Sequence, residues 1–274
     1  MNARRVVSVA LALAAPVVCE GCLPSNDPLD LHLDVVSIAA VIVAGETEVH
    51  VLAGFPHRPL DDPPPSVTAD LSGSGWKAPF APAALADCEG GPIRWPIPLT
   101  CLHAVLPEAV REGVAYRIEG RAPLGSFAGE AVVPAAPVVV EPTDTLRLKP
   151  SGYQLPVPIR YRVSSEIGTL RPEIAEIRDS SGDQPDAFVI PDTLDVEADS
   201  ATLTVDYYTA RPTRITLQLL GIGWNYTRFV EASESNPFRS PFPEFGIRGE
   251  GVFGYFDGAA VSGPIHVVAA AAER

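Results

Sequence analysis

Two cysteines stand at the end of an apolar segment near the start of the sequence, where a lipid could be attached to them. Arg4 and Arg5 precede an apolar run at 6–18, which is followed by the sequence CEGC. A basic start, a short apolar core and a small residue before a cysteine are typical of a secretory lipoprotein signal. The run is too short to cross a bilayer. We predict cleavage after Gly21 and acylation of Cys22.

The choice of Cys22 depends on the residue before it. Gly21 is small, whereas Cys19 follows the branched Val18. Lipidation of Cys19 stays open as an alternative, and so does an ordinary cleaved signal that releases a soluble protein. With Cys22 acylated, residues 1–21 are a signal peptide and 22–30 a lipid-anchored tether. Several acyl chains on one cysteine would hold the protein stably at a membrane.

A second pair of cysteines lies inside the mature chain. Cys88 and Cys101 enclose a turn-rich segment that contains Gly90 and Gly91. An even pair in an exported protein favours a disulfide. A metal site is the alternative, but His103 is the one nearby histidine and does not complete a ligand set. We therefore predict a Cys88–Cys101 disulfide, no metal and no cofactor.

Two acidic turns could bind calcium, which prefers carboxylate oxygens. Asp61 and Asp62 precede three prolines, and Asp179, Ser181 and Asp183 surround a glycine. Neither continues into a twelve-residue calcium loop. An exposed acidic turn and a hairpin turn are the respective interpretations that we favour.

The sequence contains no recognisable catalytic constellation. It has no Gly-x-Ser-x-Gly elbow, and Gly73-Ser74-Gly75 is typical of a turn. His50, His57, His103 and His266 have no recognisable nucleophile beside them in the sequence. Catalytic triads can be remote in sequence, so this pattern does not exclude an enzyme. We predict a protein without catalytic residues.

Aromatic residues could provide a stacking surface for a sugar or a peptide. The candidates are Trp76, Trp95, Trp224, Tyr207 and Tyr208. In a β-sandwich such residues more often lie in the core. Trp95 lies in an apolar stretch that predicts burial. Trp76 follows a glycine and precedes a lysine, so we expect it to be exposed and to be a possible ligand-stacking residue.

The charge of the chain argues against one class of partner. The formal net charge is −14, and the acidic residues are dispersed. Such a chain is repelled by nucleic acid and by anionic lipid surfaces. We therefore predict no nucleic-acid binding, and we expect membrane association through the lipid anchor alone.

Short strand patterns dominate the mature sequence. The 29 prolines and 22 glycines are spread along the chain without repeats, and 46% of the residues are hydrophobic, which favours many short strands over disorder. Hairpins and turns at regular spacing are typical of immunoglobulin-like sandwiches. We predict an all-β protein of two such domains, 31–134 and 138–274, joined by the PAAP linker. At most one or two short helices are expected, one of them at 224–232.

Residues 233–256, SESNPFRSPFPEFGIRGEGVFGYF, carry a pattern shared with a known family. The order Asn236-Pro237-Phe238, then Pro241, then Gly251-Val252-Phe253-Gly254 resembles the ending of the domain-of-unknown-function 4249 family of bacterial lipoproteins. Short motifs extend the resemblance over most of the mature chain, although Gly249-Glu250-Gly251 departs from the family's Gly-Gly-Leu-Gly-type run. The resemblance implies a β-rich lipoprotein that often accompanies outer-membrane TonB-dependent transporters. It implies no functional residue, and glycines at this spacing suit a bulged strand packed close to another backbone.

Together these features predict a binding or accessory lipoprotein of the cell envelope, attached to the outer membrane. The partner that we expect is an outer-membrane β-barrel transporter or another surface protein. The alternative is a carbohydrate-binding or glycan-hydrolysing surface lipoprotein, with Trp76 as a contact for the sugar.

Overall fold

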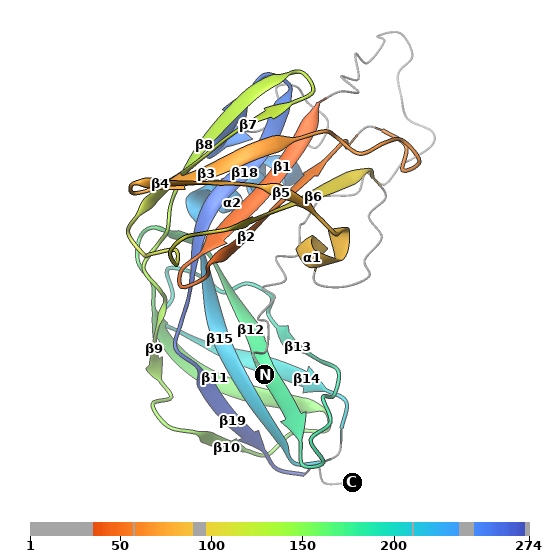
Figure 1. Ribbon diagram of the computed structural model, residues 1–274. Helices are drawn as coiled ribbons and strands as arrows, with labels where there is room; N and C mark the ends of the chain where they lie inside the picture. The colour runs from red at the N-terminus through yellow and green to blue at the C-terminus, as the bar shows by residue number, and fades with distance from the viewer. Residues whose placement is uncertain (1–34, 57, 90–96, 210, 236–243, 272–274) are drawn as a thin grey trace. The chain divides into compact units, whose positions relative to one another are not determined.

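The computed structural model describes residues 35–56, 58–89, 97–209, 211–235 and 244–271. The signal peptide, the tether, Cys22, His57, Trp95 and the segment 236–243 lie outside these residues. The described residues form two compact units (Figure 1). Unit 1 contains the chain up to Val132 and again Asn225–Asp257, and unit 2 contains Val133–Trp224 and the chain from Gly258.

Unit 1 has two sheets and two short helices. Its strands up to Val132 are β1 (Val36–Val43), β2 (Glu48–Gly54), β3 (Thr68–Gly73), β4 (Trp76–Pro79), β5 (Ala81–Ala83), β6 (Leu99–Val105), β7 (Ala115–Ala122) and β8 (Gly125–Val132). Its later elements are β16 (Glu244–Phe245), β17 (Ile247–Gly249) and the first part of β18 (Val252–Val261). The helices are α1 (Leu85–Glu89) and α2 (Trp224–Ser235). Within the described part of the chain, no helix is long and apolar enough to cross a membrane.

The strand order of unit 1 is immunoglobulin-like. One sheet has the order β1-β2-β6-β5 and the other β8-β7-β3-β4. When β1, β2, β3, β5, β6, β7 and β8 are lettered A to G in chain order, the sheets become A-B-E-D and G-F-C, which is the arrangement of this fold. The hydroxyl of Tyr116, near the start of the F strand, accepts a hydrogen bond from the backbone N–H of Arg111 (2.9 Å). A tyrosine bonded back to the chain at this corner is a further feature of the fold.

Unit 2 repeats this topology. Its strands are β9 (Val138–Glu141), β10 (Leu146–Leu148), β11 (Gln154–Arg162), β12 (Ile167–Asp179), β13 (Ala187–Ile190), β14 (Ser200–Tyr207), β15 (Thr213–Gly223) and β19 (Ile265–Ala269). The sheet β9-β11-β14-β13 has the order A-B-E-D, and β19-β15-β12 has the order G-F-C. The short β10 pairs with β19 in parallel. The prediction of an all-β protein with two immunoglobulin-like sandwiches is therefore confirmed, and so is the helix near residue 224.

Alternation along β11 shows why these segments form a sandwich. Leu155, Val157, Ile159 and Tyr161 are buried, and the residues between them are exposed. The buried set packs against side chains of β14, β12, β15 and β19 from both sheets, and this cluster is the core of unit 2. Period-two alternation places one face of a strand in such a core.

The domain boundary after Val132 agrees with the predicted one, but the prediction that 138–274 form one domain is wrong. Residues Asn225–Asp257 belong to unit 1. They are an excursion between β15 and β19, the F and G strands of unit 2. The excursion adds β17 beside β8 and β18 beside β1, so that each sheet of unit 1 gains a strand from late in the chain (Figure 1). Strand pairing over so long a sequence separation leaves no local signal.

The segment Gly251-Val252-Phe253-Gly254, at the end of the family-like pattern, has a structural role, as its glycines and apolar residues predicted. Residues 252–260 of β18 are all buried. Gly254 has a φ of 125°, a left-handed value that favours glycine. A Cβ at this position would overlap the backbone carbonyl oxygen of Ile38 on β1. Glycine therefore allows β18 to approach β1 closely.

We predict that Phe253→Ala lowers the free energy of unfolding by about 3–5 kcal/mol, because it removes a large buried side chain. Val105→Ala, on an exposed position of β6, is the control and should change it by less than about 0.5 kcal/mol. Denaturant unfolding of the two variants measures both values. A Phe253→Ala protein with wild-type stability that no longer binds a partner would instead identify this segment as an interface.

Candidate functional site

The exposed face of the sheet β13-β14-β11-β9 gathers aromatic side chains at one end. Tyr208 is 62% exposed, Tyr153 55%, Phe188 46% and Ile190 46%. The ring of Tyr208 lies between the other two rings, with centroids 6.1 Å from Tyr153 and 6.4 Å from Phe188. We call these four side chains the aromatic face. Large apolar side chains that cluster at a surface mark binding sites more often than isolated ones do.

The strand register places these residues together. Phe188 on β13 lies opposite Asp206 on β14, and Asp206 lies opposite Gln154 on β11. Tyr208 follows Asp206 by two residues and is held by a hydrogen bond from its backbone N–H to the carbonyl oxygen of Asp186 (3.2 Å). Because side chains alternate along a strand, Tyr208 and Asp206 share the outer face, whereas Tyr207 between them is fully buried.

The neutral surface continues along the sheet beyond the rings. Ile190 pairs with Thr204, and Thr204 pairs with Pro156, which is exposed. Pro156 and Pro158 are tolerated in β11 because β9 pairs with it from Arg160 onward, so that both prolines have a paired strand on one side alone. The outer face of β11 and β13 is thus poor in charge near the aromatic face.

An acidic side chain, Asp206, lies within this surface. The Oδ1 atom of Asp206 is buried and has no hydrogen-bond partner within the described residues. A buried carboxylate oxygen without a donor destabilises a protein, because it has lost its hydration.

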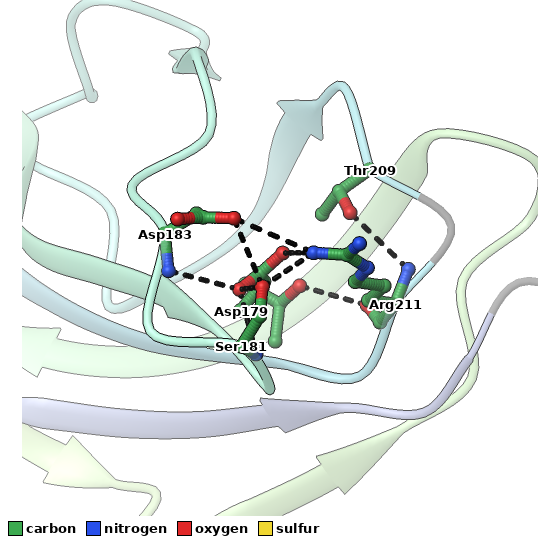
Figure 2. Close-up of polar contacts among 6 residues, drawn as sticks. Asp179, Ser181, Asp183, Thr209 and Arg211 are labelled. Atoms are coloured by element: carbon green, nitrogen blue, oxygen red, sulfur yellow. Dashed lines mark hydrogen bonds and ion pairs between the residues drawn. The ribbon is translucent and has the colours of Figure 1, made fainter.

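A polar cluster fixes the loop that follows Tyr208 (Figure 2). The guanidinium of Arg211 donates to Asp179 Oδ2 (3.2 Å), to Asp183 Oδ2 (3.4 Å) and to the hydroxyl of Ser181. The other oxygen of Asp179 accepts hydrogen bonds from the N–H groups of Ser181 (2.9 Å) and Asp183 (3.0 Å). The backbone N–H of Arg211 donates to the side chain of Thr209 (3.2 Å). This cluster joins the β14–β15 loop to the turn after β12.

In the same cluster, the carboxylates of the Asp179–Asp183 turn have a cationic partner within the protein. Arg211 lies where a calcium ion would have to bind, and it pairs with both carboxylates. The sequence predicted a hairpin here, and this is wrong in one respect: β12 pairs with β15 and β13 with β14, so the turn connects two sheets. At the other acidic turn, Asp62 lies 4.0 Å from Arg58. No group of three or more histidine, cysteine or acidic side chains suited to a metal occurs in the described parts of the chain.

The pKa of Asp179 is lowered, chiefly by the hydrogen bond from the hydroxyl of Ser181, with the two backbone N–H donors and Arg211 adding to it. A carboxylate with a lowered pKa in the folded state stabilises the fold at a pH above its unfolded pKa of about 3.9. This stabilisation is lost as the pH falls through the lower pKa of the folded state.

We therefore predict that Asp179→Asn lowers the denaturation midpoint clearly at pH 7 and that the difference from wild type shrinks below about pH 4. Asp192→Asn, at an exposed position of the same unit, should have little effect at either pH. Urea unfolding at a series of pH values measures the difference. A difference that stays constant down to pH 2.5 would contradict the assignment.

The predicted disulfide is confirmed. Cys88 in α1 and Cys101 in β6 are bonded, with their Cα atoms 5.8 Å apart. The bond attaches α1 to the sheet β1-β2-β6-β5 of unit 1.

Trp76, expected to be exposed, is half-buried. Its indole N–H donates to Glu108 Oε1 (2.8 Å), and its ring lies 5.9 Å from that of Tyr116. The expectation was wrong because Gly73, opposite Trp76 in the β3–β4 pair, has no side chain and the ring packs over it. Trp76 belongs to unit 1, so it is no part of the aromatic face. Trp224, at the start of α2, donates its N–H to the carbonyl oxygen of Ser165 (2.9 Å).

Of the histidines that the sequence singled out, two come together. His50 on β2 lies opposite His103 on β6, with ring centroids 4.7 Å apart. Burial lowers the pKa of His50, and the neighbouring His103 lowers it further. His266 lies in unit 2, near the hydroxyl of Thr216 (3.5 Å).

Tyr208 was among the aromatic candidates that the sequence offered, whereas Tyr153, Phe188 and Asp206 were not. Phe188 and Ile190 alternate with Ala187 and Val189, all apolar, so period-two alternation did not reveal an outward face. Tyr153 follows Gly152, whose φ of 64° makes a turn that a glycine at this place could have indicated.

No protein-family profile matches the chain, and no curated protein sequence matches it. Among solved structures, it is similar to the N-terminal Ig1-2 module of the Drosophila receptor protein tyrosine phosphatase DLAR, at 11% identity and a TM-score of 0.30, with 85% of this chain and 98% of that one covered. It is also similar to the D0-D1 domain of intimin, at 7% identity and a TM-score of 0.21, with 85% and 96% covered. The fold assignment rests on the strand order described above.

Proposed function

We propose that this protein is a lipid-anchored binding module of the bacterial cell envelope, without catalytic activity, that holds a protein partner on its aromatic face. The observation that carries the proposal is the cluster of three exposed rings in unit 2. Tyrosine and phenylalanine are enriched at protein interfaces, because a large ring buries much apolar area and loses little conformational entropy on binding.

The envelope location rests on the first residues and on the disulfide. The apolar run before Cys22 supports export and acylation. The Cys88–Cys101 disulfide supports an oxidising compartment. The resemblance to the domain-of-unknown-function 4249 family points to a lipoprotein and to an outer-membrane β-barrel transporter as the class of partner.

The partner proposal is tested by photo-crosslinking in cells of the source bacterium. A benzophenone side chain in place of Tyr208 should form one discrete adduct with an outer-membrane β-barrel, identified by mass spectrometry. The same group at Val105 in unit 1 or at Asp144 in unit 2, both exposed, should not form it. Equal adduct formation from all three positions, or none from Tyr208, would rule out the aromatic face as the binding surface.

The anchor is tested separately by intact-mass analysis of protein extracted from membranes. We expect a chain that begins at Cys22 and carries the additional mass of acyl chains, and we expect Cys22→Ser to move the protein out of the membrane fraction. A chain that begins at Cys19, or an unmodified chain in the soluble fraction, would contradict lipidation at Cys22.

A second function has an observation in its favour. Exposed tyrosine rings are also surfaces on which a sugar ring can stack, so a carbohydrate-binding lipoprotein remains the alternative, with Tyr208 in place of Trp76 as the main contact. Saturable binding of an envelope glycan that is lost in Tyr208→Ala would favour it over a protein partner.

A further inference from the structure

We propose that the aromatic face recognises a basic side chain of the partner, an arginine above all, which Asp206 binds through its carboxylate. This inference rests on the proposed function and names the chemistry of the contact. Its first support is the position of Asp206. Asp206 lies between Phe188 and Gln154 in the strand register, on the sheet that carries the aromatic face.

The second support is the lack of an internal donor. Asp206 Oδ1 is shielded from solvent and accepts no hydrogen bond from the described residues. The loop that follows β14 carries Arg211, but its guanidinium pairs with Asp179 and Asp183. Asp206 as a whole is partly exposed, so a guanidinium at the surface would approach the carboxylate from its exposed side and interact with the charge that Oδ1 shares.

The third support is the kind of surface that surrounds the carboxylate. Aromatic rings present a negative face that attracts cations, and guanidinium groups stack on such rings while donating to a carboxylate. Tyr208 and Phe188 lie on the same face as Asp206 and are 62% and 46% exposed. The net charge of −14 would also speed the approach of a basic partner.

A neutral sugar fits these observations less well. Sugar hydroxyls also donate to carboxylates, but they do not gain from the charge of Asp206 together with the negative faces of the rings. The two ligands therefore give different results when the charge of the ligand alone is changed.

In the experiment, the mature chain is titrated with a short peptide of alternating glycine and arginine. Binding is measured by calorimetry and by changes in the NMR chemical shifts of unit 2. The control peptide replaces each arginine by citrulline, which keeps the shape and removes the charge. We expect the citrulline peptide to bind about tenfold more weakly or worse. A neutral glycan oligomer is the third ligand, and its binding in preference to the arginine peptide would overturn the inference.

The variants separate the two parts of the contact. Asp206→Asn should weaken binding of the arginine peptide about tenfold or more, and Tyr208→Ala by roughly three- to thirty-fold. Asp144→Asn, an exposed aspartate in the loop after β9 at the opposite edge of the sheet, should leave it unchanged. Asp206→Asn should also raise the unfolding midpoint or leave it unchanged, because it removes an unpartnered charge. A structural role for Asp206 would lower it.

The outcomes distinguish this inference from the proposed function. If Tyr208 crosslinks a partner but Asp206→Asn binds the arginine peptide as wild type does, the basic ligand is wrong and the binding surface stands. If neither crosslinking nor peptide binding depends on Tyr208, both are wrong. Should Asp206→Asn fail to fold, Phe188→Leu provides the same comparison through the ring beside the carboxylate, and unchanged binding would again overturn the inference.

Discussion

Burial of β18 on both of its faces is the constraint on which the architecture of unit 1 depends. Its residues 252–260 are all buried, and its neighbour β1 has seven of its eight residues in the core. Two such strands can lie side by side when no side chain separates their backbones, and Gly254 against Ile38 meets this condition. The excursion that brings β18 to β1 also supplies β17 to the second sheet. One late segment thus completes both layers of a sandwich whose other strands come from the first half of the chain.

Local patterns made much of this fold predictable. The many short strands, the helix near residue 224 and the turn at Gly73–Gly75 were predicted correctly from the sequence, because period and turn chemistry are properties of neighbouring residues. The assignment of Asn225–Asp257 to unit 1 was not predicted, because it depends on pairing with strands about 100 residues or more away in sequence. The Asp179–Asp183 turn misled for the same reason, since the strands on its two sides pair with different partners.

The candidate site was less predictable than the fold. Tyr207 and Tyr208 are adjacent and alike in sequence, yet one is in the core and the other is the centre of the aromatic face. Trp76 looked exposed from its neighbours, but a glycine across the hairpin gave its ring a place to pack. Asp206 carries no mark in the sequence at all. Its significance comes from an oxygen that the surrounding fold shields without supplying a donor, and only the three-dimensional register shows it.

The discontinuity of unit 1 has a consequence for synthesis. The chain is made, and would cross a membrane on export, from its N-terminus, so the strands β1 to β8 come first and residues 225–257 follow. Until those residues arrive, β1 and β8 each keep an edge with unpaired backbone groups, which is the kind of edge that aggregates. Unit 2, whose strands begin after Val132, must be nearly complete before unit 1 can close. Unit 1 therefore cannot complete its two sheets until the second half of the chain is present. A fragment that ends at the linker lacks β17 and β18, the strands that pair with β8 and β1.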